Sequence, residues 1–100
     1  MAATEHNGWI HAVATTFVIA VGIYLRLSLD EWRWIILAIG LVWPAEAMNT
    51  AIERVADAIT IEPNENIRYG KDVAAGGVLT AAIVSAAIGL TIFVPHLMAA

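Results

Sequence analysis

The chain lacks cysteine and has little charge for its length. None of its 100 residues is cysteine, five are lysine or arginine, and nine are aspartate or glutamate. Without cysteine, neither a disulfide framework nor a thiolate metal site can form. The net charge of -4 offers no basic footprint for nucleic acid, so we expect no nucleic-acid partner.

The N-terminal segment also lacks basic residues. Residues 1–7 contain neither lysine nor arginine, whereas a secretory signal peptide begins with a positively charged region. We therefore expect the first apolar stretch to be permanent structure.

Apolar residues dominate what is present. They make up 60% of the chain, and the mean hydropathy is +0.75. Roughly half of an ordinary soluble chain is apolar, so these values indicate lipid as the solvent. Helices satisfy their own backbone hydrogen bonds in hydrocarbon, whereas open strands cannot. We therefore predict an all-α single domain over 1–100, with membrane spans over 8–26, 31–59 and 71–95 and a polar loop over 60–70.

Local signals set the expected helix ends. Ser28 and Glu31 have the spacing of a capping box at the start of the second helix. Pro95 is expected to end the third helix.

A polar stripe runs along the second predicted helix. Glu46, Asn49, Glu53 and Asp57 are spaced by three, four and four residues, which places them on one helix face. Ionisable groups at membrane depth cost several kcal/mol each unless they are paired, hydrated or used. The stripe could emerge into water, which suits Asp57 best. Glu46 directly follows the apolar run and fits that interpretation least.

The residue types of the stripe have a shared chemistry. Carboxylates bind divalent cations through oxygen, and a carboxylate free of metal can act as a general base. Lys71 and Asp72 precede the third span, where a lysine at a helix start favours phosphate. These are parts of a phosphoryl-transfer site. A proton or cation pathway would use similar residues, so spacing alone leaves both open.

The motif formed by these residues resembles that of a known family. Glu46-Ala-Met-Asn49-Thr-Ala-Ile-Glu53, then Asp57, then Lys71-Asp72, resembles the bacterial integral-membrane diacylglycerol kinases, a family that includes the undecaprenol kinases. The resemblance implies transfer of the γ-phosphate of ATP to the hydroxyl of a membrane lipid. It also implies a homotrimer in the bacterial cytoplasmic membrane, which agrees with the difficulty of burying polar groups between only three helices.

The resemblance assigns a role to each matched residue. Glu46 would be the general base, and Asn49 would position the reacting groups. Glu5 and Glu53 would hold Mg²⁺ on the ATP phosphates. The remaining contacts to the nucleotide would come from Glu62, Pro63, Asn64, Lys71 and Asp72.

Two alternatives stay open. The family usually begins with an amphipathic surface helix, and this chain starts just before Glu5, so we expect that helix to be absent or truncated. With that departure and the unusual Pro44, the chain could be a catalytically weak or inactive membrane scaffold or regulatory member. It could also conduct ions along the stripe. His11 is expected near the lipid headgroups or bonded across helices, and His96 at the interface.

Overall fold

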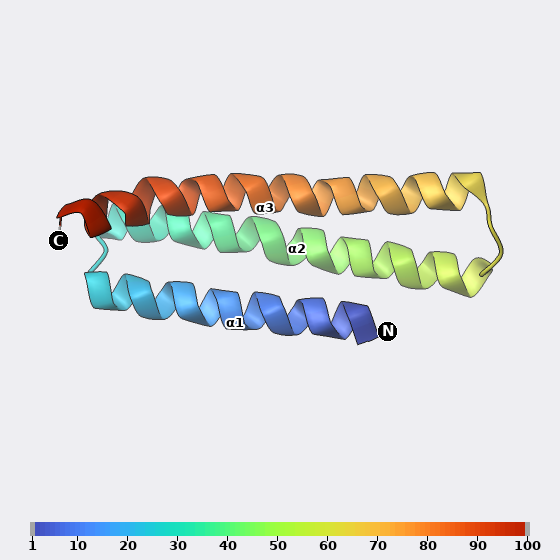
Figure 1. The fold of residues 1–100 in the computed structure, drawn as a ribbon, viewed down its shortest axis with the longest axis horizontal. Helices are drawn as coiled ribbons and strands as arrows, with labels where there is room; N and C mark the ends of the chain where they lie inside the picture. The colour runs from blue at the N-terminus through green and yellow to red at the C-terminus, as the bar shows by residue number, and fades with distance from the viewer. Residues whose placement is uncertain (1, 100) are drawn as a thin grey trace.

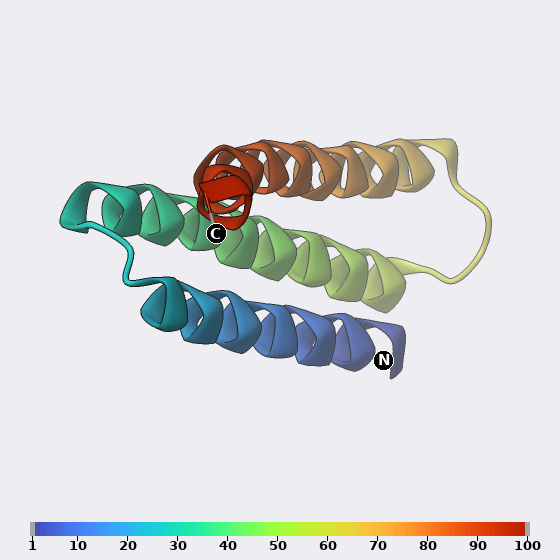
Figure 2. The same cartoon turned by 60° about the vertical axis from the view of Figure 1, so that its left-hand side comes forward.

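The computed structural model describes residues 2–99, with side chains described from Gly8 onward. The chain forms three helices, α1 (Ala2–Leu25), α2 (Leu29–Ile59) and α3 (Glu65–Ala99). They lie side by side with α2 between α1 and α3 in both views (Figures 1 and 2). The prediction of an all-α chain is confirmed for this part of the chain, and each helix is long and apolar enough to cross a membrane.

Most apolar side chains point away from the protein. Only 6%, 17% and 6% of the apolar windows of α1, α2 and α3 are buried inside the structure. Trp9, Phe17, Ile36 and Leu79 are all largely exposed. Each square ångström of such surface costs about 25 cal/mol in water, so a nonpolar environment, lipid or protein, must cover these faces. The protein is therefore a multi-pass membrane protein.

The turn between α1 and α2 is fixed by local hydrogen bonds. The predicted capping box is confirmed, because the Glu31 amide donates to Ser28 Oγ at 3.1 Å and the Ser28 amide donates to Glu31 Oε1 at 2.9 Å. Arg26 closes α1 with a φ of 55°, in the left-handed region. The Leu27 amide then donates to the Gly22 carbonyl at 3.2 Å, which reverses the chain.

A small apolar core lies near this turn. Leu27, Ile35 and Ile92 are buried together, so all three contributing segments meet at one end of the bundle. Gly22 faces this core closely, because a Cβ there would lie 2.7 Å from the ring of Trp32. The absence of a side chain at residue 22 is what lets α1 approach α2.

Two predicted boundaries differ from the structure. The polar segment expected as a loop over 60–70 is a loop only as far as Asn64. Asn64 Oδ1 accepts from the Ile67 amide at 3.1 Å, so the side chain caps α3 and the following polar residues are helical.

The prediction that Pro95 ends the third helix was wrong. α3 continues to Ala99 through Pro95, and α2 likewise runs through Pro44. A proline inside a helix removes one backbone hydrogen bond, and both helices continue despite that loss. The last turn of α3 is also held by His96, whose Nε2 lies 2.8 Å from Glu31 Oε2 on α2.

Candidate functional site

Glu46 is the buried carboxylate of α2. It is 8% exposed, and it is the one charged residue that is buried among those whose side chains the structure describes. Its Oε2 lies 3.3 Å from Nε2 of His11 on α1. Burying an ionised carboxylate costs several kcal/mol unless a partner offsets the lost hydration. Glu46 is thus a buried carboxylate with a histidine as its partner.

A second polar contact joins the same two helices one turn away. Trp43 Nε1 donates to Thr15 Oγ1 at 3.0 Å. The rings of Trp43 and His11 lie 6.1 Å apart and are tilted by 59°. Since His11 and Thr15 are four residues apart and Trp43 and Glu46 are three apart, each pair shares one helix face. The polar faces of α1 and α2 therefore meet along this line.

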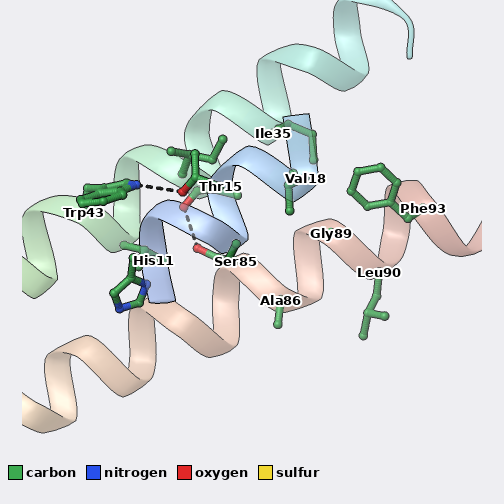
Figure 3. A pocket seen from close by; sticks show the side chains of 14 residues that line it. His11, Thr15, Val18, Ile35, Trp43, Ser85, Ala86, Gly89, Leu90 and Phe93 are labelled. Carbon is green, nitrogen blue, oxygen red and sulfur yellow. Dashed lines mark hydrogen bonds between the residues drawn. The ribbon is translucent and has the colours of Figure 1, made fainter. Parts of the chain in front are cut away.

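An apolar cavity adjoins this contact. It has a volume of about 430 Å³, and it is lined by side chains from all three helices. His11, Thr15 and Trp43 lie together at one end of it, and Phe93 and Leu90 lie toward the other (Figure 3). The size is within the range of ligand cavities, and its lining suits a hydrocarbon chain. His11 both lines this cavity and contacts Glu46.

Asn49 and Glu53 continue the polar stripe beyond Glu46. Asn49 Oδ1 is buried and has no hydrogen-bond partner among the described residues. A buried amide oxygen left unpaired costs about 1–3 kcal/mol, so a donor is expected to reach it. Glu53 is half-buried, and no basic side chain of the described residues pairs with it.

Asp57 and Lys71 meet across the α2–α3 loop. Lys71 Nζ donates to Asp57 Oδ1 at 2.7 Å. Both residues line a second, polar cavity of about 580 Å³, together with the loop residues Glu62, Pro63 and Asn64. The structure therefore gathers four of the residues predicted to contact a nucleotide at this end of the bundle. Asp57, the residue of the stripe that best suited a position in water, is the partner of Lys71.

The remaining predicted residues are separate from this cavity. Asp72 is exposed and does not line it. Glu46 lies eleven residues before Asp57, about 16 Å along the helix axis, with Asn49 and Glu53 between them. Within residues 8–99, no three acidic or histidine side chains are close enough to hold a metal ion. Glu5, the other predicted metal ligand, has a side chain outside the described residues.

Sequence reasoning did not connect His11 with Glu46. The two residues are 35 positions apart, and no local spacing relates them. The uncharged first span with a single histidine was the available signal, because a polar residue in such a span needs a partner on another helix.

Comparison with known proteins decides the family. The family model for prokaryotic diacylglycerol kinase matches residues 1–93. The chain belongs to this family. The recognition made from the Glu46–Glu53 motif is therefore confirmed.

Two named relatives cover nearly the whole chain. The undecaprenol kinase of Bacillus subtilis is 43% identical over 96 residues, which are 96% of this chain and 78% of the relative. The diacylglycerol kinase of Synechocystis sp. is 34% identical over 97 residues, again 96% of this chain but 55% of the relative. The chain thus spans about half the length of the second relative. No solved structure matches it.

Proposed function

We propose that this family member is a lipid kinase that transfers the γ-phosphate of MgATP to the hydroxyl of a membrane lipid. The observation that carries the proposal is Glu46, a buried carboxylate on a membrane helix beside an apolar cavity. A general base for a lipid hydroxyl needs this placement, because the hydroxyl stays at the membrane boundary while its chain stays in hydrocarbon.

Glu46 would take the proton of the acceptor hydroxyl. The lipid oxygen then forms a bond to the γ-phosphorus, and the bond from that phosphorus to the bridging oxygen of ADP breaks. Its electron pair leaves with the β-phosphate of ADP. Little covalent work is required of the protein in such a transfer, so catalysis comes from positioning and charge stabilisation. Asn49, one turn from Glu46, would position the reacting groups.

The loop cavity would receive the nucleotide. Lys71 supplies a cation, and the loop residues Glu62, Pro63 and Asn64 also line the cavity. Asp72, one residue after Lys71 and two turns into α3, would approach the phosphates from that helix. An extended triphosphate would have to reach from this cavity toward Glu46, along the face that carries Glu53.

Magnesium would enter with the nucleotide. Mg²⁺ is usually held by one or two carboxylates together with substrate phosphates and water. Glu53 fits this need, because it is a half-buried carboxylate on the path between the cavity and Glu46 and has no basic partner among the described residues. Glu5 would be the second ligand. The bound ion would neutralise charge on the phosphate oxygens.

The assembly is proposed to be a homotrimer in the bacterial cytoplasmic membrane. Two observations support this proposal. Another copy could cover the exposed apolar faces. It could also supply a donor to Asn49 Oδ1, which has no hydrogen-bond partner among the described residues. Arg54, Arg68 and Lys71 flank the α2–α3 loop, which favours a cytoplasmic position for the nucleotide cavity. Light scattering of the detergent-solubilised protein, corrected for bound detergent, measures the copy number.

A phosphate-transfer assay tests the proposal. Purified protein is given radiolabelled ATP and Mg²⁺ with diacylglycerol and undecaprenol in parallel mixed micelles. We expect phosphate in at least one lipid, and the relative with the higher quoted identity makes undecaprenol the first acceptor to test. Glu46→Gln keeps the shape of the side chain and should lower kcat by about 100- to 10,000-fold.

The inactive-scaffold alternative predicts a different result. A scaffold would form a stable oligomer, show no transfer to either lipid and bind MgATP weakly by calorimetry. Micromolar binding with no transfer would point instead to an untested acceptor alcohol. Full activity of Glu46→Gln would show that another group is the base.

A further inference from the structure

We propose that His11 is a positioning residue for Glu46 in the transfer reaction. By this proposal, which rests on the proposed function, His11 holds one oxygen of the Glu46 carboxylate so that the other faces the acceptor hydroxyl. The motif that assigns roles to Glu46 and Glu53 lies on α2, and it gives no role to His11, which lies on α1.

His11 and Glu46 are in direct contact. His11 Nε2 lies 3.3 Å from Glu46 Oε2, and no other ion pair or side-chain hydrogen bond is made to Glu46 by the described residues. Both side chains are largely removed from solvent. In a medium of low dielectric constant, a single donor or cation at this distance has a large effect on where the carboxylate points and on the stability of its charged form.

His11 is itself held in place. The Trp43 ring packs against it at 6.1 Å, and that ring is fixed by its hydrogen bond to Thr15 (Figure 3). The imidazole therefore contacts both an anchored indole and the carboxylate. A side chain restricted in this way loses little entropy when it orients a partner, which is the property that a positioning residue needs.

The location of the pair links it to the acceptor. Oε2 of Glu46 is engaged by His11, which leaves Oε1 for a proton of the substrate. His11 also lines the apolar cavity, so a lipid chain in that cavity would bring its hydroxyl to this pair. The nucleotide cavity at Lys71 is about 16 Å away along α2. Loss of His11 should therefore affect the chemical step and spare nucleotide binding.

Enzyme kinetics of His11→Ala and His11→Gln test this role. We expect His11→Ala to lower kcat by up to about 100-fold, because a misplaced catalytic group can cost that much. The KM for ATP should stay unchanged. His11→Gln retains an N–H donor on a side chain of similar reach, and it should recover part of the lost kcat.

A matched control uses another histidine of the chain, His96. His96 also pairs with a carboxylate of α2, at 2.8 Å from Glu31 in the first turn of that helix. His96→Ala should keep the wild-type kcat. A loss of kcat in His11→Ala alone would then be due to His11 and not to the loss of any histidine–carboxylate pair. Thermal unfolding of each variant in detergent reports whether it folds.

Three outcomes would overturn the proposal. The first is an unchanged kcat in His11→Ala. The second is a KM of His11→Ala for ATP that rises as much as its kcat falls. The third is a folded His11→Gln whose kcat is no higher than that of His11→Ala. The contact itself is tested without activity by the ¹⁵N resonances of labelled histidine, which should move for His11 in Glu46→Gln but not in Glu31→Gln. Wild-type protein without transfer to any lipid would overturn the proposed function, whereas a missing shift would overturn the His11 contact alone.

Discussion

Lys71 Nζ lies 2.7 Å from Asp57 Oδ1, and this ion pair closes the α2–α3 hairpin. Asp57 is near the end of α2, and Lys71 follows two turns into α3. Both side chains are partly solvent-exposed, so the pair contributes below about 1 kcal/mol to stability. Its main consequence is to hold a lysine ammonium at the mouth of the polar cavity.

Lys71→Met is expected to weaken ATP binding. Loss of a charge-assisted hydrogen bond to phosphate is worth about 1.5–3 kcal/mol, which corresponds to a rise of about 10- to 100-fold in the KM for ATP. Steady-state kinetics with saturating lipid measure this value. Asp57→Asn is the matched control, since it breaks the same ion pair but keeps the lysine charge, and its KM should change less. Equal increases for the two variants would instead indicate that the pair acts only through the hairpin.

Glu53→Gln is expected to raise the magnesium requirement. Removing one carboxylate ligand should increase the Mg²⁺ concentration for half-maximal rate by at least about tenfold at fixed ATP. Titration of activity with Mg²⁺ measures it. Asp30→Asn makes the same chemical change near the other end of α2, and its titration curve should match the wild type. A wild-type curve for Glu53→Gln would remove Glu53 from the metal site.

Gly22→Ala is expected to separate α1 from the core. The added methyl group would lie 2.7 Å from Trp32 and 3.0 Å from Leu27, so one of them must move. Overpacking of this kind typically costs about 1–3 kcal/mol. Chemical unfolding in mixed micelles measures the loss. Gly76→Ala is the matched control, because no atom lies within 4 Å of a Cβ added at residue 76. Alanine has a higher helix propensity than glycine, so this variant should be as stable as the wild type or slightly more stable.

Ser28→Ala is expected to destabilise the start of α2. The variant loses the bond from the Glu31 amide to Ser28 Oγ, and N-cap losses of this type cost about 0.5–2 kcal/mol. Ser28→Thr keeps the acceptor and should lie close to the wild type in the same unfolding measurement. A stability equal to wild type in Ser28→Ala would show that the turn is held by Arg26 and Leu27 instead.

Local signals in the sequence predicted most of the fold. The capping box at Ser28 and Glu31 and the three apolar helices depend on neighbouring residues, which a sequence displays directly. The loop was predicted too long because the polar residues 65–70 were interpreted as loop, whereas they are helical and Asn64 caps the helix. The predicted stop at Pro95 failed because the His96–Glu31 contact holds the final turn.

The candidate site was only partly predictable. The stripe from Glu46 to Asp57 follows from helical periodicity, and the family motif supplied the proposed roles. The pairing of His11 with Glu46 depends on how α1 packs against α2, and that of Asp57 with Lys71 depends on the shape of the hairpin. Neither packing distance is encoded in the spacing of residues along one helix.

The line of polar contacts between α1 and α2 also has a consequence for biosynthesis. α1 is translated before α2, so His11 and Thr15 would enter the bilayer before Glu46 and Trp43 have been made. Until then their polar groups would depend on water, lipid headgroups or the insertion machinery. Capture by the second helix would then complete the membrane insertion of the first.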